Sequence, residues 1–156
     1  MRALRDRPGD ARGRADGARA ARRLALCGAA ARRCGGSPAK QRIAFDRPIG
    51  SFQAVQHKLV DLRGRVEVAR ALYQGAATLA PDQPEERDLA VAMAAFAALD
   101  GLRKVPEGAL QIFGGIGTTW EHDIHFFVRR AATLCGLLGE RSGFREIVAG
   151  HLASAS

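Results

Sequence analysis

Apolar residues recur at helical spacing from residue 51 onward. Steps of three or four residues separate the apolar positions Phe52, Val55, Leu59, Leu62, Val66, Ala69, Leu72, Ala76 and Leu79. Spacing of this kind places one apolar stripe along one face of a helix. The pattern predicts a helix over residues 51–79, about 45 Å long, with Ser51 as its N-cap.

Three more helices are predicted after this one. Prolines end the first helix, and a second follows over residues 85–113, with Asp82 and Glu85 as a capping box. Its many alanines permit close helix contact, whereas Gly101 and Pro106 are expected to weaken or kink it. A third helix is predicted over 123–138, with Gly139 as C-cap, and a fourth over 142–152, with Ser142 as N-cap.

The predicted fold class is all-α. No segment alternates convincingly with period two, so no strand is predicted. Long helices joined by short turns favour an up-and-down antiparallel bundle of the four-helix type. Residues 11–33 would have to supply the helix that completes the bundle, but their apolar stripe is poor.

The charge divides the chain into two parts. Residues 1–40 hold ten Arg and one Lys against three Asp, whereas residues 41–156 hold 13 basic and 13 acidic residues. Residues 1–38 are therefore interpreted as a basic Arg/Ala/Gly-rich segment, either disordered or translated from a foreign reading frame, and residues 39–156 as the helical domain. A nucleic-acid arm, a transit peptide and a twin-arginine or lipoprotein signal are the alternatives for the first segment.

Composition indicates the cellular environment of the domain and argues against membrane and metal-binding roles. The longest uncharged apolar run, residues 89–99, is shorter than the roughly 20 residues of a spanning helix, so no membrane segment is predicted. Three cysteines form no even framework, which favours a reducing cytoplasm. His122 and His125 alone are too few ligands for a metal site, and none is predicted.

Two sequence motifs carry a family resemblance. They are RIAFDRPIGSFQAVQHKL at residues 42–59 and ALQIFGGIG at 109–117, the second followed by WEHD at 120–123. Both resemble signatures of the acyl-CoA dehydrogenase family, in the family's order and separation. The resemblance covers residues 39–149, the C-terminal helical domain, and the family's N-terminal helical and middle β-barrel domains have no counterpart in it.

The resemblance implies an FAD site shared across a subunit interface. Arg42 matches the arginine that contacts the FAD diphosphate, for which a guanidinium offers planar, paired donors. The other implied cofactor residues, on the flavin, adenine or adenosine side, are Phe45, Phe52, Gln53, Gln111, Gly114 and Gly115. Asp46 stands where the family usually has glycine, which places a carboxylate near the diphosphate.

The resemblance also implies a chemistry, the α,β-dehydrogenation of an acyl-CoA thioester, which needs a positioned glutamate as base. Leu138 stands at the usual position of that glutamate. No Glu precedes Glu67, so the family's alternative position is empty as well. Glu140, two residues beyond Leu138, is a weak candidate, and no catalytic residue is assigned.

Three functional hypotheses follow. The first is an acyl-CoA dehydrogenase-like flavoprotein domain, incomplete and inactive alone, that works as a homo-oligomer and meets acyl-CoA through partner domains. The second is a non-catalytic, FAD-sharing partner subunit of a heteromeric acyl-CoA dehydrogenase. The third, a nucleic-acid binder acting through residues 1–33, is disfavoured because the neutral domain offers no base-reading surface.

Overall fold

The computed structural model describes residues 38–79, 84–120 and 122–154. Residues 38–41 are helical, and the elements that follow are β1 (Ile43–Ala44), β2 (Arg47–Pro48), η1 (Ile49–Ser51), α2 (Gln53–Thr78), α3 (Pro84–Phe113), η2 (Gly114–Thr118), α4 (Ile124–Leu138) and α5 (Arg141–Ser154). The predicted helix at 11–33, the capping residue Asp82 and the interpretation of residues 1–37 lie outside the described residues.

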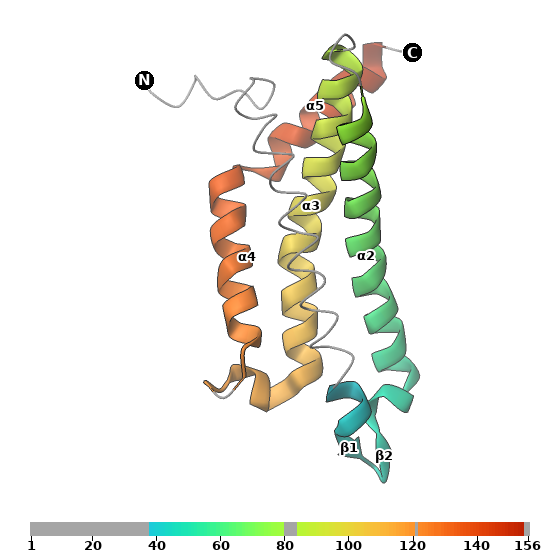
Figure 1. Cartoon of the computed structure of the whole chain (residues 1–156), viewed down its shortest axis with the longest axis vertical. Helices are drawn as coiled ribbons and strands as arrows, with labels where there is room; N and C mark the ends of the chain where they lie inside the picture. Colours follow the sequence, from blue (N-terminus) through green and yellow to red (C-terminus); the bar gives the residue numbers. More distant parts are fainter. Residues whose placement is uncertain (1–37, 80–83, 121, 155–156) are drawn as a thin grey trace.

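Helices α2, α3 and α4 run up, down and up beside one another, and α5 leans across the upper part of α3 (Figure 1). Helix α3 lies at the centre, because it packs against α2, α4 and α5. This arrangement confirms the predicted all-α, up-and-down bundle. Within the described ranges, no helix is both long enough and apolar enough to span a bilayer.

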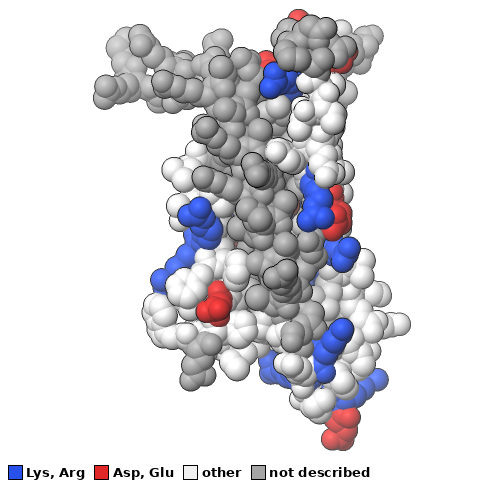
Figure 2. Space-filling view, in the orientation of Figure 1, with Lys and Arg blue, Asp and Glu red and all other residues white. Residues whose placement is uncertain are grey.

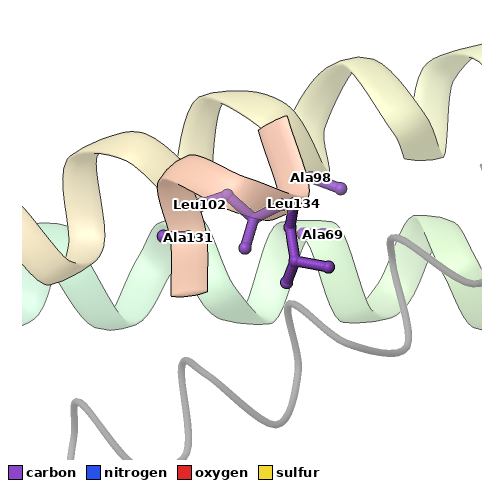
Figure 3. Packing of buried hydrophobic residues seen from close by; sticks show 5 residues of the cluster. All are labelled: Ala69, Ala98, Leu102, Ala131 and Leu134. Carbon is purple, nitrogen blue, oxygen red and sulfur yellow. The ribbon is translucent and has the colours of Figure 1, made fainter. Parts of the chain in front are cut away.

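The core is built from small and branched apolar side chains on facing helices. One buried cluster joins α2, α3 and α4 through Ala69, Ala98, Leu102, Ala131 and Leu134 (Figure 3). A second, toward the end that carries η2, contains Val66, Val105, Ala109, Phe113 and Ile124. Val66 and Ala69, both on the predicted apolar stripe of α2, thus face the core. Burial of the side chains in these clusters supplies the main driving force for packing.

Helix α3 continues through both of its expected weak points. Gly101 and Pro106 are buried and helical, with Pro106 inside the helix. Nearby, Gly108 lies so close to α2 that a Cβ there would be 2.7 Å from Leu62 Cδ2. The missing side chain at Gly108 lets the two helices approach at this point.

Two predicted helix caps are wrong, and one is confirmed. Ser51 lies in η1, where its hydroxyl donates to Pro48 O at 2.7 Å, and the N-cap of α2 is Phe52. Ser142 lies inside α5, and its hydroxyl donates to the Glu140 carboxylate at 3.1 Å. Gly139 is the C-cap of α4, as predicted, and its φ of +82 favours glycine.

A tight hairpin, not predicted from the sequence, precedes α2. Strands β1 and β2 are antiparallel, and two residues, Phe45 and Asp46, connect them. Both have positive φ, at +51 and +59, as a type I′ turn requires. Strands of two residues are too short to show an alternating pattern, so periodicity could not reveal them.

Candidate functional site

The two motifs, far apart in the sequence, meet at the end of α3. Arg42 Nη1 donates a hydrogen bond of 2.9 Å to the main-chain oxygen of Phe113, the last residue of α3. Carbonyl groups in the last turn of a helix lack partners within the helix and carry partial negative charge. The contact therefore satisfies one such carbonyl and fixes the guanidinium beside the second motif.

Gly114 makes this contact possible. Its φ is +64, a conformation that L side chains rarely adopt, and a Cβ at this position would lie 2.7 Å from Arg42 Nη1. The turn therefore favours glycine here, and a side chain would also push the Arg42 guanidinium away from its present position. The structure thus brings Arg42 and Gly114, one from each motif, into contact.

A groove of about 450 Å³ lies next to this contact, between the hairpin, the start of α2 and the end of α3. Its lining residues are Ala44, Phe45, Ile49, Phe52, Ala54, Val55, Lys58, Gln111 and Ile112. Three of the sequence-predicted cofactor residues, Phe45, Phe52 and Gln111, are among them. Lys58 Nζ donates to Gln111 Oε1, which orients the amide and holds a positive charge at the groove.

Aromatic rings and cations lie side by side in this groove. The rings of Phe45 and Phe52 stand edge to face with centroids 6.2 Å apart, and the Arg47 guanidinium lies 4.0 Å from the Phe52 centroid. Phe45 is 90% exposed although it occupies a left-handed conformation that costs about 1–2 kcal/mol. Flat apolar faces flanked by cations suit a planar heterocycle joined to phosphate groups.

Asp46 sits at the tip of the hairpin. The family that the motif resembles usually has glycine at this position, and the φ of +59 gives the reason for that preference. Aspartate adopts the left-handed region more readily than most residues, so the turn forms without glycine. The view in Figure 2 shows basic side chains gathered at this end of the molecule, with acidic atoms at its tip.

Four of the seven predicted cofactor residues do not line the groove. Arg42 and Gly114 contact each other at the end of α3, as described above, and the other two are exposed. Gln53 is exposed in the first turn of α2. Gly115 is exposed in η2, and a Cβ there would meet nothing within 4 Å. Conversely, Arg47 and Lys58 line or flank the groove but were not singled out from the sequence. Lys58 stands three residues after Val55 and therefore lies near it on the same face of the helix. This spacing was the signal in the sequence that could have placed Lys58 at the groove.

The candidate base lies at the other end of the bundle. Leu138 is the last residue of α4, the chain turns at Gly139, and Glu140 is exposed where it accepts the Ser142 hydrogen bond. Helix α4 starts at the end of the bundle that carries η2 and the hairpin, and it rises toward the other end over 15 residues, about 22 Å (Figure 1). One chain therefore does not bring Glu140 to the groove.

The two histidines pack the start of α4. His122 lies against the Phe113 ring at a centroid distance of 4.1 Å, and His125 Nδ1 is 2.7 Å from the main-chain oxygen of His122. His125 also contacts the ring of Trp120. In the described part of the chain, no three metal-ligating side chains gather at one point.

Comparison with known proteins agrees with the motifs. The family profile for the C-terminal domain of acyl-CoA dehydrogenases matches residues 11–153, which includes much of the basic segment. Acyl-CoA dehydrogenase FadE34 of Mycobacterium tuberculosis is 41% identical over 102 residues, 65% of this chain and 14% of FadE34. Acyl-CoA dehydrogenase IpdE2 of Mycolicibacterium smegmatis is 40% identical over 100 residues, 64% of this chain and 30% of IpdE2.

Solved structures show the same architecture. The Tcur3481–Tcur3483 steroid ACAD superposes with a TM-score of 0.81 at 27% identity, over 89% of this chain and 38% of the matched one. The ChsE4–ChsE5 complex of Mycobacterium tuberculosis gives a TM-score of 0.81 at 27% identity, over 90% of this chain and 38% of the other. The chain thus spans well under half the length of these relatives.

Proposed function

Because this chain belongs to the acyl-CoA dehydrogenase family, we propose that it is a cofactor-contacting domain of an FAD-dependent acyl-CoA dehydrogenase, shared across a subunit interface and inactive alone. FAD, when bound, supplies the hydride acceptor for α,β-dehydrogenation of an acyl-CoA thioester. The contribution of this chain is to bind and orient the adenosine diphosphate half of the cofactor.

The observation that carries the proposal is the anchored guanidinium of Arg42 beside the groove. Its bond to Phe113 O uses one nitrogen, and the planar fork has further N–H donors for a diphosphate. Glycine at 114 serves the turn after α3 and also leaves room for the Arg42 guanidinium. The residues present therefore fit an anionic group at this point.

The groove supports the same assignment at its aromatic side. Phe52 offers a ring face to which Arg47 adds positive charge, and Phe45 extends the apolar surface outward. Lys58 and Gln111 supply a cation and an amide for the polar edge of the ligand. An adenine ring next to a diphosphate matches this order of apolar and cationic groups.

Cofactor binding by the purified chain tests the proposal. We expect the chain to bind FAD. ADP should compete with FAD for this site and FMN should not, because the proposed contacts are to the adenosine diphosphate half of the cofactor. Arg42→Lys keeps the charge and loses the fork, and should weaken FAD binding about tenfold. Arg130→Gln, an exposed arginine of α4, is the matched control. Competition by FMN, or equal binding by Arg42→Lys and the control, would contradict the proposal.

Turnover tests the proposed inactivity. Leu138 cannot accept a proton, and loss of a general base alone costs about 10²–10⁴-fold in rate. The chain with FAD and a dye acceptor should therefore form no enoyl-CoA from short, medium or long acyl-CoAs. Enoyl-CoA formation that disappears in Glu140→Gln would instead identify Glu140 as the base.

The second candidate, a base-free partner subunit of a heteromeric acyl-CoA dehydrogenase, is favoured by Leu138. One structural relative, ChsE4–ChsE5, is itself a complex of two different chains. Flavin absorbance distinguishes the candidates. A partner subunit retains FAD only when copurified with a base-bearing dehydrogenase chain, and that mixture turns over acyl-CoA. Stable flavin absorbance of the chain alone argues against this candidate.

A further inference from the structure

A second groove lies on the bundle away from the candidate cofactor site. It has a volume of about 470 Å³ and is formed by α2, α3 and α5. Its apolar lining includes Val68, Leu72, Met93, Phe96 and Val148, and Val68 is 55% exposed. Val68 stands ten residues after Lys58 on α2, about 15 Å along the helix, so the two grooves are separate.

The rim of this groove carries more positive than negative charge. Asp100 of α3 pairs with Arg141 of α5 at 3.1 Å, with Lys104 at 2.9 Å and with Arg65 of α2. One carboxylate is therefore shared by three cations drawn from three helices. Arg145, one turn after Arg141, also lines the groove, and it makes no ion pair within the described ranges.

The cations of the rim are held in position over the apolar lining. The Arg141 guanidinium lies 4.0 Å from the centroid of the Phe96 ring. The Asp100 carboxylate fixes Arg65 and Arg141 from opposite sides of the groove. A side chain that is already held in place loses little conformational entropy when a ligand binds. Its pairing with an anion therefore carries a smaller entropic penalty.

We propose that this groove binds an amphiphilic organic anion, with a carboxylate head at Arg145 and Arg141 and an apolar body over Val68, Leu72 and Phe96. Charge complementarity selects an anion, because cations outnumber carboxylates on the rim. The volume of about 470 Å³ falls within the roughly 300–1,000 Å³ of small-molecule sites. A long-chain carboxylate combines the two required features.

Fluorescence titration of the full chain tests the proposal. The probe is dansylaminoundecanoic acid, and the comparison is the alcohol with the same chain and no charge. We expect the acid to bind in a one-to-one complex at least tenfold more tightly than the alcohol. Arg145→Gln should weaken binding of the acid about tenfold and leave the alcohol unchanged, because it removes charge pairing alone. Arg130→Gln on α4 is the matched control and should change neither.

A second measurement uses the unaltered chain, so its result does not depend on whether the Arg145→Gln variant folds. A diazirine-bearing fatty acid should crosslink to peptides of α2, α3 and α5 that line the groove, and dansylaminoundecanoic acid should compete. Equal affinity for acid and alcohol, an unchanged Arg145→Gln, or labelling elsewhere overturns the proposal. Displacement of the probe by FAD would show that it binds the other groove, and this also overturns the proposal without affecting the proposed function.

Discussion

Replacement of Gly114 by alanine tests the contact between the two motifs. An L side chain at φ +64 costs about 1–2 kcal/mol. The new Cβ would lie 2.7 Å from Arg42 Nη1 and would displace Arg42 from Phe113 O. A hydrogen bond to a charged group contributes about 1.5–3 kcal/mol, and the exposure of Arg42 favours the lower end. We expect Gly114→Ala to lower the free energy of unfolding by about 2.5–3.5 kcal/mol.

Urea unfolding followed by far-UV circular dichroism measures this loss. Gly115→Ala is the matched control, because a Cβ at Gly115 meets nothing within 4 Å and its φ is not left-handed. That variant should stay within about 0.5 kcal/mol of the unaltered chain. In an Arg42→Ala background, Gly114→Ala should cost only the backbone strain of about 1–2 kcal/mol. The reasoning would be refuted if Gly114→Ala and Gly115→Ala lost the same stability. It would also be refuted if Gly114→Ala cost as much in the Arg42→Ala background as in the unaltered chain.

Three further predictions concern the bundle. Leu102→Ala removes a fully buried side chain and should cost about 3–4 kcal/mol in urea unfolding. Gly64→Ala, in an open helical position, should raise stability by about 1 kcal/mol, whereas Gly108→Ala should gain nothing because Leu62 has to move. Burial raises the pKa of Asp100, but the Lys104 hydrogen bond and nearby cations outweigh it, so the net pKa lies below the usual value. Asp100→Asn should therefore be less stable than the unaltered chain above about pH 4, and the difference should fade as acid titration passes through the lowered pKa.

Helix positions could be predicted from the sequence because the core uses one periodic stripe. Val66, Ala69 and Ala76, all on the predicted stripe of α2, are buried. Caps were harder to predict, because a serine before a helix can bond to more than one main-chain group. Ser51 bonds backward to Pro48 O in η1, so Phe52 begins the helix without a side-chain cap.

The candidate site was only partly predictable. The motif resemblance indicated Arg42, Phe45, Phe52 and Gln111, and these residues lie together at one end of the bundle. The bond from Arg42 to the end of α3 joins segments far apart in the chain, and no spacing rule reveals such a contact. The second groove depends on how α5 docks against α3, which brings Arg141 to Asp100. Local sequence patterns carry no information about that docking.

The central position of α3 has a consequence for how the bundle opens. Helices α2, α4 and α5 each pack on α3, so α5 can separate while the α2–α3 pair stays intact. Amide hydrogen exchange reports such partial openings as separate free energies along one chain. Exchange should be slowest in the middle of α3, near Leu102, and faster in α5, whose main buried anchor is Phe144. Truncation within α5 would then leave a folded remainder, whereas interruption of α3 would remove the support of α2, α4 and α5 at once.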